Sequence, residues 1–151
     1  MTDIKIYEGV TAVTIVGIAT TDDAKTVNQL FENIGKASID LDMISLELSV
    51  NDRMNVGFTF DDNELPKLLT VIKEMQDAIP SPLINCGNVK FVIKSPEMIG
   101  IPGYSAKIFS ALRSVSCIPI LVTTGIDEIS LLVRNSDSAD VGKKLNKMYQ
   151  C

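Results

Sequence analysis

The chain has 151 residues, of which 46% are hydrophobic, and this composition allows one ordinary domain or two small ones around an aliphatic core. Its formal net charge of -5 and its scattered basic residues argue against a nucleic-acid partner, because a phosphate backbone requires clustered Lys and Arg. No apolar run reaches the roughly 20 residues that cross a bilayer, and the start does not resemble a signal peptide, so we expect a cytoplasmic protein with no membrane partner.

The first half of the chain is predicted to form a strand, a helix, a hairpin and a second helix. Residues 12–18 are rich in β-branched side chains, which favour strands. Alternating polar and apolar residues over 44–50 and 54–60 predict a hairpin with one buried and one solvated face. A second helix is expected over about 62–75, with Pro66 in its first turn. The first helix is predicted from apolar residues that share one helical face, namely Val27, Leu30, Phe31, Ile34 and Ala37.

The second half repeats this order of elements. A strand is expected over 89–93, a Gly/Pro loop over 99–103, two further strands over 118–133 and a last helix from about 136. Leu30 of the first copy matches Ile108 of the second, and Ile34 matches Leu112. We therefore predict an α+β fold of two ferredoxin-like modules of the βαββαβ type, with antiparallel sheets and helices on one face.

The expected boundaries are 1–79 for the first module, 80–87 for the connector and 88–151 for the second module. The Pro-rich segment 80–82 ends the preceding helix and marks the connector. The sequence leaves open whether the N-terminal strand around residues 4–7 is exchanged between the modules.

Residue types that carry metal and catalytic chemistry are sparse. The chain has no His, and its three cysteines, Cys86, Cys117 and Cys151, form no Cys-x-x-Cys pair, so no metal site and no cofactor are expected. No Gly-rich phosphate-binding loop occurs, and the acidic residues stand at expected caps and turns. We therefore predict no catalytic residue and no enzymatic activity of the chain on its own.

Two segments resemble the regulatory region of aspartate kinases, which contains paired ACT modules. Residues 38–44 resemble the run from the first ACT helix into the next strand, and residues 102–109 resemble the helix start of the second ACT copy. Thr123-Thr124 and Glu128-Ile129-Ser130 follow in the matching order. The resemblance spans residues 12–148. It implies a homodimer that binds a free amino acid, lysine or threonine, and regulates a catalytic kinase subunit or domain of lysine, threonine and methionine biosynthesis. The kinase domain itself has no counterpart in this sequence.

A free amino acid brings a carboxylate and an ammonium, and both need partners. Backbone N–H groups at a helix N-terminus favour a carboxylate, and the Gly-rich loop 100–103 suits a close approach. Side-chain carboxylates favour the ammonium. The candidate effector-binding residues, from this chemistry and from the resemblance, are Asp22, Asp40, Asp42, Met43, Ile44, Ile99, Gly100, Ile101, Pro102, Gly103, Tyr104, Ser105, Ile120, Thr123 and Thr124.

Other interpretations remain open for these residues. Asp22 and Asp23 are favoured as a plain helix cap over an effector contact, and Gly103 is equally suited to permit a sharp turn. The first copy lacks the Pro and Gly that family members carry after the Asp, and Leu46 and Ile118 stand where threonine-sensitive members carry Gln and Asn. Two alternatives therefore stand beside amino-acid regulation. One is a structural dimerisation module with a degenerate effector site, and the other is an orphan ACT sensor of another small metabolite.

Overall fold

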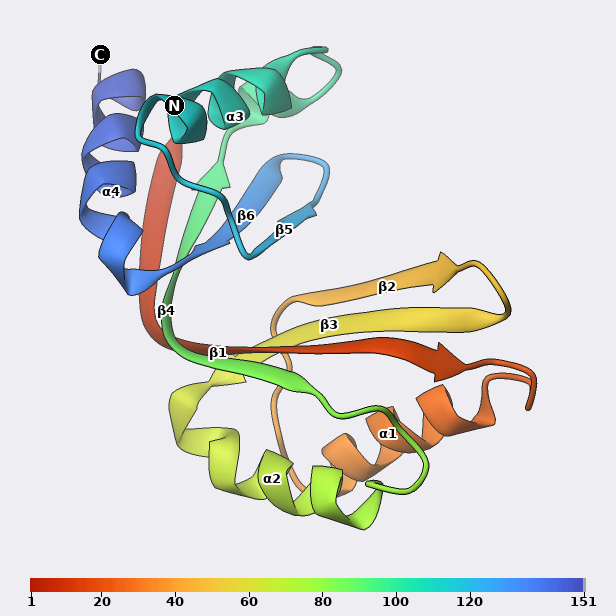
Figure 1. Ribbon diagram of the computed structural model, residues 1–151. Coiled ribbons are helices and arrows are strands. Elements are labelled where there is room, and N and C mark those ends of the chain that lie inside the picture. Colours follow the sequence, from red (N-terminus) through yellow and green to blue (C-terminus); the bar gives the residue numbers. More distant parts are fainter. Residues whose placement is uncertain (151) are drawn as a thin grey trace. The chain divides into compact units, whose positions relative to one another are not determined.

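The computed structural model describes residues 1–150, which divide into two compact units (Figure 1). Unit 1 contains Met1–Gly9 and the chain from Gly87 onward, and unit 2 contains Val10–Cys86. The strands follow the hydrogen-bonded order β2-β3-β1-β4-β6-β5. Two long strands, β1 (Asp3–Ala19) and β4 (Leu83–Lys94), contribute residues to both units, so unit 1 is discontinuous in sequence while unit 2 is one continuous segment.

Unit 2 is one βαββαβ module. After the second part of β1 come α1 (Lys25–Lys36), β2 (Ile44–Ser49), β3 (Arg53–Asp61), a single 3-10 turn, α2 (Leu65–Glu74) and the first residues of β4. Strand β3 pairs antiparallel with β1 on one side and β2 on the other. Both helices cover the same face of these strands (Figure 1). The largest fully buried side chains beneath them are Ile15, Ile18, Leu30, Ile34, Phe58, Phe60 and Leu68.

Unit 1 has the same order of elements. The second part of β4 leads through a 3-10 turn (Pro96–Met98) to α3 (Tyr104–Ser114), β5 (Leu121–Thr124), β6 (Glu128–Val133) and α4 (Asn135–Tyr149). The start of β1 completes the module. Strand β6 pairs antiparallel with both β4 and β5. The largest fully buried side chains are Phe91, Ile93, Ile108, Leu112 and Leu131.

The internal repeat extends to the strand register. Ala19 pairs with Arg53 in unit 2, and Lys94 pairs with Glu128 in unit 1, with the same separation along the chain. The residue that follows β1 in unit 2 and the residue that follows β4 in unit 1 make equivalent hydrogen bonds. The Thr20 N–H donates to the Asp52 carbonyl, and the Ser95 N–H donates to the Asp127 carbonyl, both at 2.8 Å. The predicted α+β fold with a repeated antiparallel module is therefore confirmed.

The observed units differ from the expected boundaries of 1–79, 80–87 and 88–151. Residues 1–9 group with the second half of the chain, and the expected connector runs into strand β4 from Leu83. Side-chain contacts explain the grouping. Ile4 packs against the unit 1 core, the Tyr7 ring lies 5.5 Å from the Lys90 ammonium, and Thr2 Oγ1 donates to Ser95 Oγ at 3.0 Å.

The predicted hairpin is present, but only one of its strands is buried. Val56, Phe58 and Phe60 of β3 are at most 1% exposed, as expected from their alternation. By contrast, β2 carries Ile44, Leu46 and Leu48, which are 47%, 51% and 71% exposed. The expectation that this row is buried was wrong, because β2 is an edge strand with a neighbour on one side only.

Candidate functional site

The candidate residue Asp22 lies in the loop between β1 and α1 and caps that helix. Its carboxylate accepts hydrogen bonds from the Thr26 N–H at 3.1 Å and the Thr26 hydroxyl at 2.6 Å. The bond from the Thr26 hydroxyl is the main reason that the pKa of Asp22 lies below its usual 3.8. The same loop is fixed to the β2–β3 turn, since Thr20 donates from both its N–H and its hydroxyl to the Asp52 carbonyl, at 2.8 and 2.6 Å.

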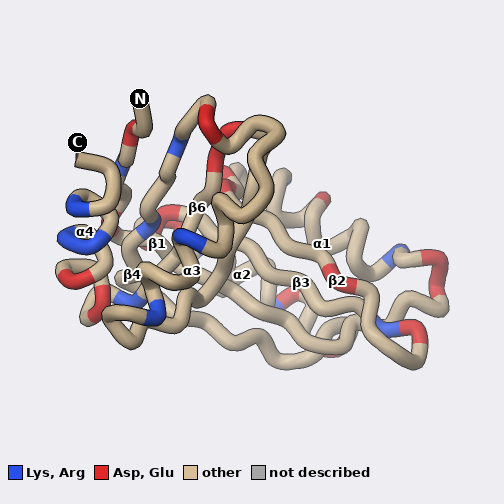
Figure 2. Tube along the Cα trace, turned by 90° about the horizontal axis from the view of Figure 1, so that it is seen from above, with Lys and Arg blue, Asp and Glu red and all other residues tan. Residues whose placement is uncertain are grey.

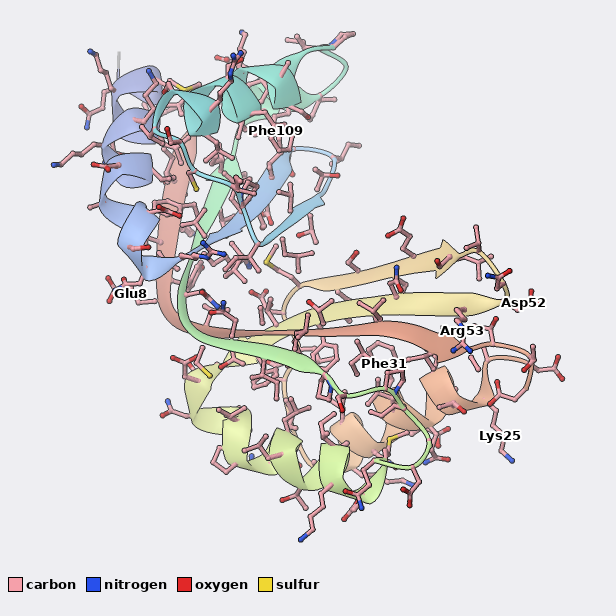
Figure 3. The ribbon with its side chains drawn as sticks, in the orientation of Figure 1. Glu8, Lys25, Phe31, Asp52, Arg53 and Phe109 are labelled. Atoms are coloured by element: carbon pink, nitrogen blue, oxygen red, sulfur yellow. The ribbon has the colours of Figure 1, made fainter. Side chains whose placement is uncertain are left out.

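Figure 3 shows this end of unit 2 with Asp52 and Arg53 at the turn and Lys25 pointing away from the sheet. Arg53 Nη1 donates to the Gly17 carbonyl at 2.8 Å, where a register shift between Ile15 and Ile18 interrupts the β1–β3 ladder. Gly17 has φ +81, which only glycine adopts without strain. The polar groups at this end therefore hold one another in place.

The candidates from Asp40 to Ile44 lie at the opposite end of unit 2 from Asp22. They lead from α1 into β2, where Ile44 pairs with Phe58, while Ser49 at the other end of β2 pairs with Arg53. Those two ends of β2 are roughly 17 Å apart at the usual rise per residue. Asp22 therefore does not meet Asp40 or Asp42, whose side chains are exposed.

Met43 is buried within unit 2 rather than presented at the surface. It is 2% exposed, its N–H bonds to Thr59 Oγ1 at 3.0 Å, and its carbonyl accepts from the Thr59 N–H at 3.0 Å. Asp42 likewise donates its N–H to the Thr59 carbonyl at 2.9 Å. Met43 thus anchors the α1–β2 connection, and the candidates beside it, Asp40, Asp42 and Ile44, have exposed side chains.

The candidates in unit 1 form the long loop and helix start between β4 and α3. Gly100 and Gly103 have φ +71 and +91, a left-handed conformation that suits the sharp turn expected at Gly103. Ile99 and Ile101 are 53% and 54% exposed, and within residues 1–150 the N-cap residue of α3, Gly103, gives that helix no side-chain cap. Pro102 and Ser105 are exposed beside them. The first N–H groups of α3 thus lack the side-chain cap that Asp22 gives α1.

Strand β5 and its flanks hold the remaining candidates. Thr123 and Thr124 end β5, and the turn that follows is joined to the β4–α3 loop through the Ser95 to Asp127 hydrogen bond. These threonines therefore lie at the same end of unit 1 as the loop. Ile120 precedes β5 at the other end, where its N–H donates to the Leu132 carbonyl at 2.7 Å.

A cavity of about 620 Å³ opens beside Tyr104 in unit 1, where the start of α3 meets the end of α4. The rings of Tyr104 and Tyr149 stack with centroids 6.1 Å apart, and Met148 lines the same cavity. Glu97 and Lys107 supply one negative and one positive side chain at its exposed edge. Both tyrosine hydroxyls are buried, and among residues 1–150 neither has a hydrogen-bond partner of good geometry. Burial raises the pKa of Tyr149, and the adjacent Tyr104 hydroxyl and the Glu97 charge raise it further.

The sequence pointed to Tyr104 but not to Glu97, Lys107 or Tyr149. Isolated charged residues on a loop and a helix are indistinguishable from an ordinary solvated surface in a single sequence. Tyr104 opens α3 and Tyr149 ends α4, and no local pattern in the sequence links the two.

Within the part of the chain that the structure describes, charged and metal-binding side chains form no further candidate site. Figure 2 shows acidic residues in the first part of α4 and basic residues in the part that follows, the order that suits the dipole of a solvated helix. No group of three or more Cys, Asp or Glu side chains within residues 1–150 could hold a metal ion. Cys117 is 5% exposed, and burial is the main cause that raises the pKa of its thiol, as expected for a core residue. Within the same residues, no helix has both the length and the apolar composition of a membrane span.

Curated relatives resemble the chain over almost its whole length. It is 23% identical to aspartokinase 2 of Bacillus subtilis over 149 residues, which is 97% of this chain and 36% of the relative. It is 28% identical to an aspartokinase of Corynebacterium efficiens over 142 residues, or 91% of this chain and 33% of the relative. The chain thus spans about a third of the length of these relatives. No protein-family model matches it.

Solved structures match the fold. The regulatory subunit of aspartate kinase from Thermus thermophilus superimposes with a TM-score of 0.83 at 16% identity, covering 97% of this chain and 96% of the subunit. A structure of aspartokinase alpha and beta subunits gives a TM-score of 0.85 at 20% identity, with coverages of 98% and 97%. Aspartokinase III of E. coli, solved with lysine and aspartate, gives 0.73 at 15% identity and covers 95% of this chain but 32% of its own.

These similarities agree with the fold described above for the two units. The chain has the fold of the ACT-type regulatory region of aspartate kinases, and its sequence resembles that of aspartokinases over nearly its whole length.

Proposed function

We propose that the chain is a non-catalytic, amino-acid-binding regulatory region that works in the cytoplasm with the catalytic subunit or domain of an aspartate kinase. Lysine or threonine is the proposed effector, in the biosynthesis of lysine, threonine and methionine. A bound amino acid favours whichever arrangement of the protein binds it better, and the kinase responds to that shift in population. The proposed assembly is a homodimer.

One observation carries this proposal. The chain matches 96% of an isolated regulatory subunit of aspartate kinase from Thermus thermophilus, while it matches only about a third of two full-length aspartokinases. These residues therefore correspond to the regulatory part of such a protein. The E. coli neighbour solved with lysine makes a free amino acid the first ligand to test.

The chemistry of the β4–α3 loop supports a carboxylate-binding role in unit 1. The N-terminus of α3 has no side-chain cap, and the left-handed Gly103 before it leaves its N–H groups open to a close approach. In unit 2 the corresponding helix start is already occupied by the carboxylate of Asp22. We therefore assign the effector carboxylate to the helix start at Gly103–Ser105, with Thr123 and Thr124 near it, rather than to the loop that contains Asp22.

Thermal unfolding of the purified chain tests the proposal. A ligand that binds only the folded state raises the melting temperature as its concentration rises. We expect L-lysine or L-threonine at millimolar concentrations to raise it, and D-lysine and D-threonine to raise it less. If neither L-amino acid shifts the melting temperature at any concentration, the sensing role is wrong.

A second candidate function is a dimerisation module without an effector, and the surface of β2 favours it. Its exposed apolar row of Ile44, Leu46 and Leu48 lies on an edge strand, where a second chain can pair. Both functions predict a dimer in sedimentation equilibrium, so the response of the melting temperature to amino acids separates them. A stable dimer whose melting temperature does not change with any amino acid supports the dimerisation module. A Leu48→Lys variant is then expected to be monomeric. An orphan sensor of another metabolite predicts a shift with that metabolite and none with lysine or threonine.

A further inference from the structure

A second ligand site is suggested by the cavity between α3 and α4 of unit 1. Its volume of about 620 Å³ lies within the range of small-molecule pockets. All of its lining residues belong to unit 1, and they come from the N-terminal segment, the 3-10 turn after β4, the start of α3 and the end of α4. It lies on the side of α3 that carries Tyr104 and Lys107, which are one helical turn apart.

Two tyrosine hydroxyls make this cavity unusual. Tyr104 is 7% exposed, and its hydroxyl and that of Tyr149 are buried next to each other, with no other hydrogen-bond partner within residues 1–150. Two neighbouring hydroxyls can satisfy only one of their two O–H donors between them, so one O–H donor has no acceptor. A buried hydroxyl without a partner costs about 1–3 kcal/mol, and folded proteins rarely retain one without a reason. A polar ligand atom that reaches between the two rings supplies the missing partner.

The remaining lining groups define the chemistry of the ligand. The Tyr104 and Tyr149 rings and the Met148 side chain form an apolar wall. At the exposed edge, Glu97 offers a carboxylate and Lys107 an ammonium, and neither forms an ion pair within the described residues. One group of each sign matches the ammonium and the carboxylate of a zwitterion. The apolar wall matches a side chain without charge.

We propose that this cavity binds a free α-amino acid with an apolar side chain, its ammonium toward Glu97, its carboxylate toward Lys107 and its side chain against Met148 and the tyrosine rings. The site shares Tyr104 with the helix start assigned to lysine or threonine, but it uses the Tyr104 side chain and not the backbone N–H groups, and it does not depend on that assignment. A chain with both sites responds to two amino acids of different chemistry.

Titration of the full chain with L-methionine and with L-leucine tests the site. The chain has no Trp and three Tyr, so the tyrosine absorbance band reports on the ligand directly. We expect a saturable change of this band with at least one of the two amino acids. The amines that lack the carboxylate, 3-(methylthio)propylamine and isoamylamine, are expected to bind at least tenfold more weakly.

Substitutions at the edge of the cavity localise the binding. Glu97→Gln and Lys107→Gln are each expected to weaken it at least tenfold, whereas Lys143→Gln, an exposed lysine of α4 outside the cavity, is expected to leave it unchanged. Tyr104→Phe and Tyr149→Phe keep the rings and remove only the hydroxyls, and each is expected to weaken binding severalfold with the melting temperature of the free protein retained. Tyr7→Phe, on the sheet, is their control.

Two results overturn the proposal. One is the absence of any saturable change with both amino acids. The other is equal affinity in the wild type, Glu97→Gln and Lys107→Gln. The shift of melting temperature with lysine or threonine is expected to persist in Lys107→Gln, so failure of this site and failure of the regulatory function give different results.

Discussion

The loops that open α1 and α3 occupy equivalent places in the two units, yet they are built differently. The unit 2 loop, residues 20–24, is short and reaches α1 through Asp23 and Ala24, both at φ +59. The unit 1 loop, residues 95–103, is longer and makes its left-handed turns at Gly100 and Gly103. The helix after the short loop is capped by Asp22, and the helix after the long loop has no side-chain cap.

This difference shows where a duplicated module is free to diverge. The strand register is retained between the units, because a shift by one residue would turn every buried side chain toward solvent. The loops carry no such constraint. Unit 2 accepts a left-handed Ala24 at a cost of about 1–2 kcal/mol and closes its helix start with its own carboxylate. Unit 1 keeps glycines and an open helix start, which is the arrangement that a ligand needs.

Removal of residues 1–8 is expected to have the largest effect, because it breaks one unit and spares the other. Unit 1 loses a strand, the Ile4 contact with its core and the Tyr7 contact with Lys90. We expect a loss of about 5 kcal/mol or more, which approaches the whole stability of a small domain. Hydrogen exchange should then show lost protection over 87–150 and retained protection over 10–86. Equal loss in both units would contradict the assignment of residues 1–9, and Glu8→Gln is the control.

Truncation of equivalent core residues tests how similar the two units are inside. Leu30 and Ile108 are both 0% exposed at matching helix positions. Leu30→Ala and Ile108→Ala are each expected to lower the free energy of unfolding by about 2–5 kcal/mol, measured by urea titration. The Phe109→Ala variant is the control, because that ring is 47% exposed and its loss should cost below about 1 kcal/mol. A cost at Phe109 equal to that at Ile108 would mean that α3 buries a different face.

Substitution of one left-handed residue in each loop, Gly103 and Ala24, compares the backbone strain of the two turns. Gly103→Ala is expected to destabilise the protein by about 1–2 kcal/mol, since φ +91 is strained for any L side chain. Ala24→Gly relieves the same kind of strain at φ +59 and is expected to stabilise by up to about 1 kcal/mol, after the larger unfolded-state entropy of glycine is subtracted. Urea titration of both variants measures the two effects. If both substitutions changed the free energy of unfolding in the same direction, left-handed strain would not be the common feature of the two turns.

Acid titration gives the smallest expected effect and concerns the capped helix only. The pKa of Asp22 is lowered in the folded protein, mainly by the bond from the Thr26 hydroxyl, so its ionised form favours folding above the usual pKa of 3.8. This contribution disappears as the pH falls through the folded-state pKa. Stability should therefore fall less steeply below pH 4 in Asp22→Asn than in the wild type, as followed by thermal melts. Identical acid profiles would remove the capping role.

Local patterns in the sequence predicted much of the fold. The helical spacing of Leu30 and Ile34 and the alternation of Val56, Phe58 and Phe60 match buried positions. The burial of β2 was predicted wrongly, because an apolar row on an edge strand has the same alternation as one in the core. The long strands β1 and β4 were under-predicted for another reason. Each serves two units, so polar residues such as Lys5 and Glu8 interrupt the apolar pattern.

The candidate site was less accessible to prediction, because it depends on tertiary placement. Sequence order suggested that Asp22 and Asp40 share a role, but strand β2 separates the two ends of unit 2 at which they lie. The glycines of the β4–α3 loop were predictable, since a left-handed turn needs them. The cavity was not, because Glu97, Lys107 and Tyr149 come from separate elements with no shared motif.

Isothermal titration calorimetry of the full chain with L-lysine and L-threonine tests the central claim most directly. The regulatory assignment predicts a saturable heat from at least one of the two, with no more than a small fraction of it from the D-enantiomer. The absence of any saturable heat from both, in a sample that unfolds cooperatively, would contradict the claim that this fold binds an amino-acid effector.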